Sequence, residues 1–285
     1  MTTLYESAYA KINLTLDVLG VRPDGFHDLK SVMQTVSLCD DIEIDIGTKQ
    51  PWCLKCEADG VPLDERNLAW KAAKVFFDAT GYDPEGLEIR MVKRIPSQAG
   101  LGGGSSDAAA VFRGLNRHYG YPMTMQQLAD LSAKVGSDVP FCVLGGTVMV
   151  EGRGEFVRKM PDMPKCYIVI CKPEFPVSTP ALYKKLDECE IAVHPDNDAA
   201  EAAIVAGDLA ALAKQVINVF DPVVAAEHPE IEHIKSICAE NGALAQQMSG
   251  SGSATFGIMP DRDSAMAAFE KLKETYHQVF LADPV

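Results

Sequence analysis

Alternating apolar and polar residues near the start of the chain predict its first strand. Apolar side chains occupy every second position from Ala10 to Val18, which is the period of a strand with one buried face. In such a strand Lys11 and Asn13 share the other, polar face. The alternation returns at 32–38 and at 42–46, after a Pro-Asp-Gly turn, and predicts an antiparallel meander.

Helical spacing and cap residues predict the elements that follow. They are a helix over 67–80 closed by Gly81, a strand over 87–92, a helix after a glycine-rich loop with apolar positions from 108 to 119, a helix over 124–135, a helix start at 137–140, and a hairpin strand over 147–150. This part of the chain therefore mixes strands with helices.

Prolines at 161 and 164 mark a predicted domain boundary, with one domain over 1–160 and another over 161–285. The second domain is predicted to hold a strand over 167–171, a short helix begun by Thr179-Pro180, two or three helices between 198 and 241, strands over 245–248 and 255–258, a helix over 262–276 and a strand over 278–282. Strands and helices mix without strict βαβ repetition, which favours an α+β fold.

Charge and cysteine content narrow the classes of function. The 285 residues carry a net charge of −14, which disfavours binding to nucleic acid or to an anionic membrane surface. No apolar run is long enough to span a bilayer. The first residues also lack the basic stretch followed by an apolar stretch that is typical of a secretory signal. The eight cysteines are scattered, and only Cys53 and Cys56 are close, without the second pair that a zinc site needs. We expect reduced thiols and a cytoplasmic protein.

A glycine loop between a predicted strand and a predicted helix is the strongest chemical signal. It reads Gly100-Leu101-Gly102-Gly103-Gly104-Ser105-Ser106-Asp107. Glycines allow a ligand to approach the backbone, and free amides at a helix start attract phosphate. A flexible connector is the simpler alternative, but three consecutive glycines that lead directly into a helix favour a phosphate loop.

Known phosphate loops of other classes do not match. Gly104 is followed by Ser105 rather than by the lysine of a Walker A loop. A Rossmann loop would carry an acidic residue about 20 positions later, and none stands there between Asp107 and Asp130. Protein-kinase motifs and a serine-hydrolase elbow are also missing.

The segment 96–110 resembles the ATP-binding motif of the GHMP kinases, the superfamily named for galactokinase, homoserine kinase, mevalonate kinase and phosphomevalonate kinase. Four further segments narrow the resemblance to the branch that acts on a cytidine-diphosphate-linked alcohol: Ala10-Lys11-Ile12-Asn13-Leu14, Gly25-Phe26-His27, Gly136-Ser137-Asp138-Val139-Pro140 and Gly250-Ser251-Gly252. The resemblance covers nearly the whole chain. It implies a two-domain α+β fold, with an antiparallel-rich N-terminal domain that binds ATP, an α+β C-terminal domain, and the active site between them.

The same resemblance implies a reaction. The expected activity is ATP-dependent phosphorylation of the 2-hydroxyl of 4-diphosphocytidyl-2-C-methyl-D-erythritol, in non-mevalonate isoprenoid precursor biosynthesis. Phosphoryl transfer needs a phosphate cradle, positive charge and a base. The resemblance assigns Asp138 as the general base, paired with Lys11. Judged by position alone, Lys11 would instead be a solvated lysine on a strand and Asp138 would be a helix cap.

The resemblance also assigns the ligand contacts. ATP, accompanied by Mg²⁺ as cosubstrate and without a prosthetic group, is expected to bind Asn67, Lys93, Pro96, Ser97, Gly100, Leu101, Gly102, Gly103, Gly104, Ser105 and Ser106. Ser105, Ser106 and Asp107 also suit a helix start, where they would act as caps. The role of Asp107 and the metal ligands stay open, as does the oligomeric state.

For the acceptor, the resemblance places a cytosine between Phe26 and Tyr183, with Asn13, His27, Asp138 and Thr179 as polar contacts. Phe26 stands where a tyrosine is usual, which keeps the ring face and loses a hydroxyl. Tyr183 would otherwise be a helix residue packed on the core, and His27 a turn residue bonded to backbone. A mevalonate or homoserine kinase and a non-catalytic nucleotide-binding module are the alternative functions.

Overall fold

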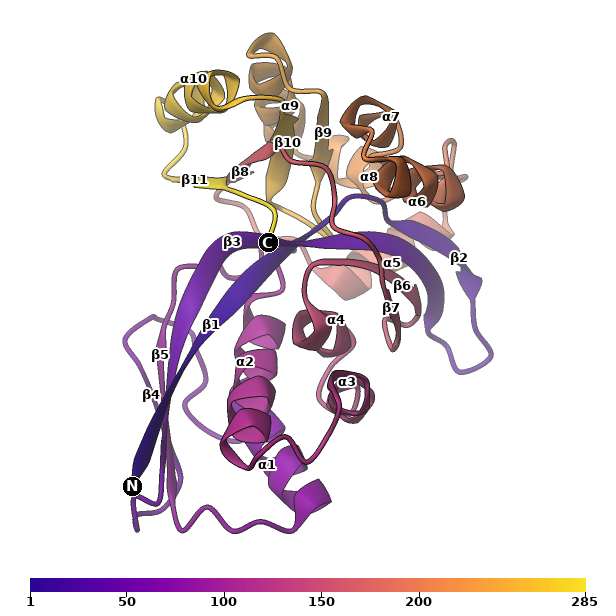
Figure 1. The fold of residues 1–285 in the computed structure, drawn as a ribbon. Coiled ribbons are helices and arrows are strands. Elements are labelled where there is room, and N and C mark those ends of the chain that lie inside the picture. The colour runs from indigo at the N-terminus through magenta and orange to yellow at the C-terminus, as the bar shows by residue number, and fades with distance from the viewer.

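A computed structural model describes residues 1–285, which form two sheets and ten helices (Figure 1). The first sheet contains β1 (Thr2–Asn13), β2 (Asp17–Val21), β3 (His27–Ile46), β4 (Cys53–Cys56), β5 (Leu87–Val92), β6 (Thr147–Gly152) and β7 (Phe156–Lys159). The second contains β8 (Tyr167–Lys172), β9 (Ala245–Met248), β10 (Thr255–Met259) and β11 (Gln278–Ala282).

The helices divide between the two sheets. Helices α1 (Leu68–Thr80), α2 (Gly103–His118), α3 (Met125–Ser132) and α4 (Val139–Leu144) lie beside the first sheet, and Figure 1 shows them on one side of β1 and β3. The others are α5 (Thr179–Asp187), α6 (Asn197–Ala206), α7 (Leu209–Ala213), α8 (Asp221–Ala225), α9 (Glu230–Glu240) and α10 (Arg262–Lys273). The α+β prediction is confirmed.

Strand β3 organises the first sheet because it is 20 residues long and pairs with four other strands. Its second half lies between β1 and β5, and its first half pairs with β2 and β6. The sequence predicted two separate strands over 32–38 and 42–46, but they are parts of this one strand. The second sheet has the order β11-β8-β10-β9 and is antiparallel throughout.

Several predicted boundaries are wrong. Four helices, not two or three, lie between residues 197 and 240, since α7 and α8 are too short to show a helical period. The predicted helix over 124–135 ends at Ser132, although Thr124 and Gln127 form the expected capping box at its start. Strand β4, which contains Cys53 and Cys56, was not predicted and pairs in parallel with β5. The eight cysteines are all free thiols in the structure.

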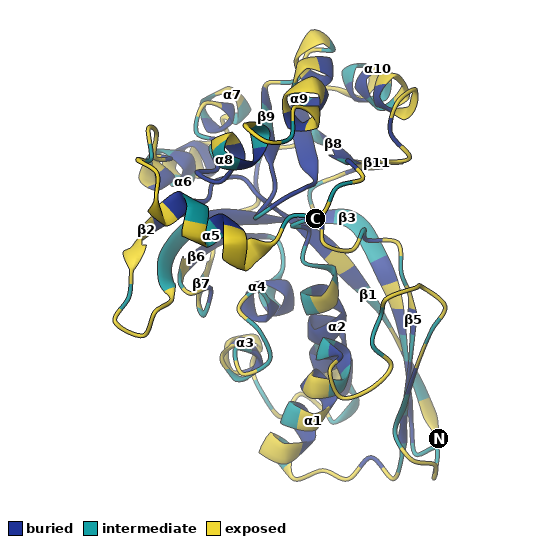
Figure 2. Cartoon of the chain, turned by 180° about the vertical axis from the view of Figure 1, so that it is seen from behind, coloured by how far each residue is buried: buried dark blue, intermediate teal, exposed yellow.

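The two sheets share a core. One cluster of 25 buried residues includes Ile12 and Met149 from the first sheet together with Ile168 and Phe256 from the second. Figure 2 shows the resulting buried band where the two sheets meet. For this reason every residue from Ala10 to Val18 is buried, so the polar face predicted for this strand is covered as well. No helix in the structure is long and apolar enough to cross a bilayer.

Side chains of α2 cover the free edge of β1. The backbone carbonyls at positions 5, 7 and 9 accept hydrogen bonds from Arg117, Arg113 and Ser106, respectively. Unpaired strand edges are sites of unwanted strand pairing, which these contacts prevent. They also fix the position of Lys11, near the end of β1, relative to the glycine loop at the start of α2.

Candidate active site

The glycine loop is folded tightly against two neighbouring segments. Gly100 and Gly102 have φ angles of 74° and 70°, which glycine adopts without strain. A Cβ atom at Gly100 would lie 2.0 Å from the carbonyl oxygen of Ser249, and one at Gly102 would lie 2.9 Å from Cγ of Lys11. The backbone N–H of Lys11 donates to the carbonyl of Leu101 at 3.0 Å. These glycines therefore allow β1 and the loop over 248–253 to contact the phosphate loop directly.

Helix α2 begins with uncapped amides. Its N-cap is Gly102, which has no side chain, and Ser105 and Ser106 are the third and fourth residues of the helix. The expectation that these serines cap the helix is wrong, because the helix begins three residues earlier than an N-cap at Ser105 would place it. The first amides of α2 are consequently left for an anionic ligand.

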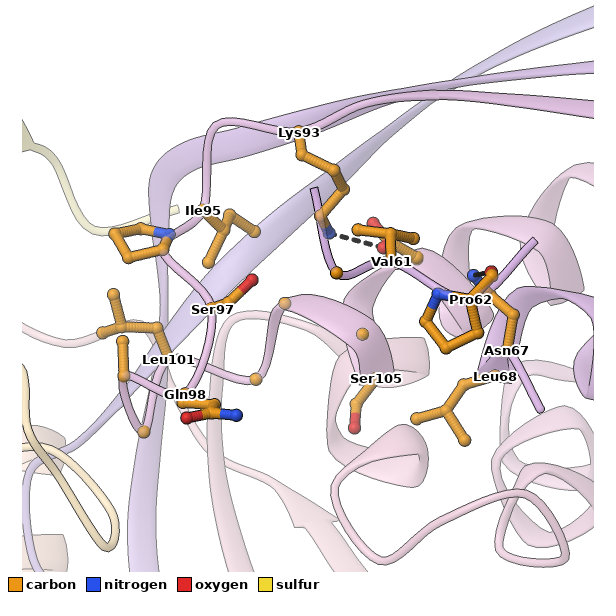
Figure 3. A pocket seen from close by; sticks show the side chains of 18 of the residues that line it. Val61, Pro62, Asn67, Leu68, Lys93, Ile95, Ser97, Gln98, Leu101 and Ser105 are labelled. Atoms are coloured by element: carbon orange, nitrogen blue, oxygen red, sulfur yellow. Dashed lines mark hydrogen bonds and ion pairs between the residues drawn. The ribbon is translucent and has the colours of Figure 1, made fainter. Parts of the chain in front are cut away.

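A cavity of about 370 Å³ opens over this helix start. Its lining includes every residue predicted to bind ATP except Ser106: Asn67, Lys93, Pro96, Ser97, Gly100, Leu101, Gly102, Gly103, Gly104 and Ser105. Figure 3 shows Ser97 and Gln98 on one side of it and Val61, Pro62 and Leu68 on the other. The second wall comes from the end of the loop between β4 and α1 and from the first residue of α1. Of this wall only Asn67 was predicted.

Ser106 lies outside this cavity. Its side chain is buried, and its hydroxyl donates to the carbonyl of Tyr9 and lies 3.4 Å from Sγ of Cys142. The structure thus turns Ser106 toward β1 and α4, while Ser105, one position earlier, faces the cavity. Successive helix residues point about 100° apart, so only one of the two can face the ligand.

Lys93 holds two buried carboxylates at the edge of the cavity. Its Nζ donates to both Asp40 and Asp107. Asp40 is fully buried and also accepts the backbone N–H of Ile95 at 2.8 Å. Burial raises the pKa of Asp107 to about 7, Lys93 opposes this shift, and Asp40 adds to it. The Oδ1 atom of Asp107 has no hydrogen-bond partner. The positive charge of Lys93 is therefore neutralised within the protein.

Lys11 and Asp138 come together beside the glycine loop. The Nζ of Lys11 lies 3.9 Å from Oδ2 of Asp138 and donates to Oδ1 of Asn13 at 2.6 Å. Asn13 in turn donates to Ser31. Lys11 is only 3% exposed, so it is not a solvated strand lysine. Asp138 precedes α4, but its side chain makes no cap hydrogen bond, which leaves the carboxylate free.

A second cavity of about 660 Å³ lies next to the first. Its lining includes Phe26, His27, Asp138, Thr179 and Tyr183 of the predicted acceptor site, and also Ser105. Ser105 borders both cavities. A smaller cavity of about 210 Å³ contains Lys11 and Asn13 and shares Asp138 with the second. A phosphate over the glycine loop and a hydroxyl near Asp138 would thus be neighbours.

The two predicted stacking aromatics differ in their surroundings. Phe26 is 56% exposed, and the guanidinium of Arg153 lies 4.8 Å from its ring centre. The ring of Tyr183 packs edge-on against Phe220 at 4.8 Å, and burial raises the pKa of its hydroxyl to about 12. Tyr183 therefore both packs on the core and borders the acceptor cavity.

Three charged residues of the acceptor cavity were not predicted. They are Arg153, Lys184 and Asp187. Arg153 lies between two glycines in the turn joining β6 to β7, and an arginine flanked by glycines in a hairpin turn is the sequence signal for it. The structure has no group of three or more His, Cys, Asp or Glu side chains placed to hold a metal ion.

The loop over 248–253 closes the site from the second sheet. Its Ser249 hydroxyl donates to the carbonyl of Gly100 at 3.0 Å, and Asn218 donates to the carbonyls of Met248 and Gly250. Ser251 and Thr179 share a hydrogen bond of 2.7 Å. This loop, which contains the predicted Gly250-Ser251-Gly252 segment, thus joins the glycine loop to the acceptor cavity.

Comparison with known proteins gives two family matches. Residues 67–146 match the family described as "GHMP kinases N terminal domain", and residues 199–278 match "GHMP kinases C terminal". Curated relatives include a 4-diphosphocytidyl-2-C-methyl-D-erythritol kinase from Caldicellulosiruptor saccharolyticus, 42% identical with 96% of this chain and 94% of that protein covered. Another, from a Geobacillus species, is 43% identical with 97% and 95% covered.

Solved structures give the same result. A crystal structure of 4-(cytidine 5'-diphospho)-2C-methyl-D-erythritol kinase matches with a TM-score of 0.81 and 30% identity, covering 98% of each chain. A homoserine kinase from Cytophaga hutchinsonii matches with a TM-score of 0.79, covering 100% of this chain and 95% of that one. At 18% identity, this second likeness concerns the fold alone.

Proposed function

The chain belongs to the 4-diphosphocytidyl-2-C-methyl-D-erythritol kinases of the GHMP superfamily, and on that premise we propose that it transfers the γ-phosphoryl group of ATP to the 2-hydroxyl of 4-diphosphocytidyl-2-C-methyl-D-erythritol. The observation that carries the proposal is the Lys11–Asp138 pair. Asp138 borders the acceptor cavity, which meets the glycine-loop cavity at Ser105.

Asp138 acts as the general base. Its carboxylate makes no cap bond and is free to accept the proton of the acceptor hydroxyl as the oxygen attacks phosphorus. Lys11 stabilises the negative charge that develops on the transferring group. Burial of Lys11 strengthens this interaction because water does not screen it.

ATP binds over the start of α2. Its phosphates accept hydrogen bonds from the amides of the glycine loop and of the first turn of the helix. The adenine lies between the loop over 60–68 and the segment from Lys93 to Ser97. This wall is apolar at Val61, Pro62 and Leu68, as suits a planar base.

We infer that Mg²⁺ accompanies ATP. The hydroxyl of Ser105 and the carboxylate of Asp138 are oxygen donors of the type that Mg²⁺ prefers, and both border the acceptor cavity. When bound, the ion neutralises charge on the phosphate oxygens. The remaining ligands would come from the nucleotide and from water.

The acceptor binds in the larger cavity. Its cytosine stacks on Phe26 and Tyr183, with His27, Asn13 and Thr179 as polar contacts. Arg153, which borders this cavity and the smaller one beside Lys11, supplies a cation for the diphosphate. In a chain of net charge −14, such local cations are needed to hold an anionic substrate.

The chain is further proposed to divide into an ATP-binding domain over 1–160 and a second domain over 161–285, with the active site between them. The last strand of the first sheet ends at Lys159 and the first strand of the second begins at Tyr167, which supports a boundary in this link.

One experiment tests the proposed function. The protein is incubated with Mg-ATP and three acceptors, the cytidine-diphosphate alcohol, mevalonate and homoserine, and the products are identified by mass spectrometry. Phosphorylation of the cytidine compound alone is expected. Phosphorylation of mevalonate or homoserine instead would contradict the acceptor assignment, and failure to phosphorylate any acceptor while ATP still binds would favour a non-catalytic module.

A further inference from the structure

His27 is held from two sides by helix α5. Its Nε2 lies 2.8 Å from Oδ1 of Asp187, the last residue of the helix. Its ring packs against Tyr183, one helical turn earlier, with the ring centres 4.5 Å apart. The His27 side chain is only 12% exposed, and all three residues line the acceptor cavity. The imidazole therefore has one orientation and one polar partner.

The bond to Asp187 determines which nitrogen carries the proton. A carboxylate accepts hydrogen bonds and cannot donate, so Nε2 must be the N–H that faces it. A neutral imidazole has only one N–H, which leaves Nδ1 as an acceptor. The hydrogen bond to Asp187 is the one that the His27 ring makes within the chain, so Nδ1 is available to a ligand.

This hydrogen-bonding pattern distinguishes pyrimidine bases. Cytosine carries an amino group on C4, which donates, whereas uracil carries a carbonyl oxygen there, which accepts. A bare Nδ1 matches the amino group and repels the carbonyl oxygen. The basic side chains of the cavity, Arg153 and Lys184, only donate. They therefore cannot recognise the amino group.

We propose that Asp187 is a positioning residue that sets the base specificity of the acceptor site: it fixes the proton on Nε2 of His27, so that Nδ1 accepts from the amino group of cytosine and excludes uracil. This inference rests on the proposed function, because it takes the acceptor to be a cytidine compound. Asp187 acts through His27 and not by touching the base.

The kinetic test compares the cytidine-diphosphate alcohol with its uridine-diphosphate analogue. The measured quantity is the ratio of their kcat/KM values, in the parent protein and in Asp187→Asn. The parent should prefer cytidine. Asn can either accept from Nε2 or donate to it, so both tautomers of His27 become available, and the ratio should fall at least about tenfold. Glu188→Gln is the matched control, because Glu188 is the exposed neighbour of Asp187 and makes no ion pair; it should keep the parent's ratio.

A second measurement does not depend on activity. Nitrogen-15 NMR of the imidazoles reports which ring nitrogen is protonated, and the chain has six histidines, so the His27 signals can be assigned with a His27→Gln variant. The parent protein should show the Nε2–H form alone, and Asp187→Leu should show a larger fraction of the Nδ1–H form. An Nδ1–H form in the parent would overturn the inference.

The outcomes separate this inference from the proposed function. If the parent does not phosphorylate the cytidine compound, the proposed function fails, and the NMR measurement still decides the role of Asp187 toward His27. If the parent phosphorylates the cytidine and uridine compounds equally, or if Asp187→Asn lowers both kcat/KM values by the same factor, the kinase assignment stands and the specificity role is refuted.

Discussion

The Nζ of Lys11 lies 3.9 Å from Oδ2 of Asp138, which places the cation of strand β1 beside the carboxylate that precedes helix α4. Lys11 is buried, whereas the Asp138 side chain is 43% exposed, toward the acceptor cavity. The pair therefore has a buried member that supplies charge and an accessible member that can meet a substrate hydroxyl.

Replacing Asp138 by Asn should abolish most of the turnover while leaving the fold intact. The substitution keeps the shape of the side chain and removes its basicity, so kcat should fall at least about a hundredfold. Steady-state kinetics and a separate ATP titration measure the two effects. Asp130→Asn, on the exposed face of α3, should behave as the parent. Near-normal turnover of Asp138→Asn would remove this residue from the mechanism.

Lys11→Met should lower kcat more than it weakens ATP binding. The charge of Lys11 is proposed to act mainly on the transition state, and losing such an interaction affects rate more than ground-state affinity. Single-turnover kinetics and ATP titration separate the two. Lys71→Met is the control, since Lys71 is exposed and makes no ion pair. If the rate were unchanged and ATP affinity reduced, Lys11 would be a ground-state contact.

The stacking assignment predicts a loss of acceptor affinity in Phe26→Ala and in Tyr183→Ala. Each should weaken acceptor binding by about 1 to 3 kcal/mol, the scale of base stacking on an aromatic ring, with little effect on ATP. Phe26→Tyr keeps the ring face and should bind as the parent. Calorimetric titration of each ligand measures this.

Phe156→Ala provides a control for general effects of removing an exposed ring, because Phe156 is 62% exposed and does not line the acceptor cavity. Parent-like acceptor binding by both Phe26→Ala and Tyr183→Ala would show that the cytosine binds elsewhere.

Replacement by Ala should have different effects at Ser105 and at Ser106, on the KM for ATP in the first case and on stability in the second. Ser105 faces the nucleotide cavity, so its loss should raise the KM for ATP with little effect on stability. Ser106 is buried and donates to the carbonyl of Tyr9, so its replacement removes this hydrogen bond and should cost about 1 kcal/mol of unfolding free energy. Urea denaturation and ATP kinetics on both variants check this contrast, and the reverse pattern would contradict the orientation of the two side chains.

Asp107→Asn should change how stability depends on pH. The pKa of Asp107 is raised from 3.8 to about 7 in the folded protein, chiefly by burial. Between about pH 4 and about pH 7, Asp107 holds a proton in the native state that it has lost in the unfolded state. The free energy of unfolding therefore declines as the pH rises through this range.

The Asn variant has no such titration, and its stability relative to the parent should therefore increase between pH 5 and pH 8. Urea unfolding at several pH values measures the difference. A constant difference would indicate that Asp107 is ionised throughout, in its bond with Lys93.

The local sequence determined the elements and the phosphate loop. The helix over 68–80 is bounded by a capping Asn67 and a left-handed Gly81, and the strand over 87–92 has the predicted limits, because caps and alternation act over a few residues. The glycine loop was likewise readable, since glycines before a helix indicate phosphate binding whatever the rest of the fold. Motif order then indicated the family.

Tertiary structure decided which side chains face the ligands. Ser105 and Ser106 are equivalent in the sequence, and only the packing of α2 against β1 turns one to the cavity and the other to Tyr9. The burial of Lys11 likewise depends on a second sheet far along the chain. Asp187 at the end of α5 meets His27 at the start of β3. This contact joins residues 160 positions apart, and no local pattern encodes it. Side-chain direction, burial and long-range pairing are properties of the packed chain, and for that reason Arg153, Lys184 and Asp187 were found in the acceptor cavity only in three dimensions.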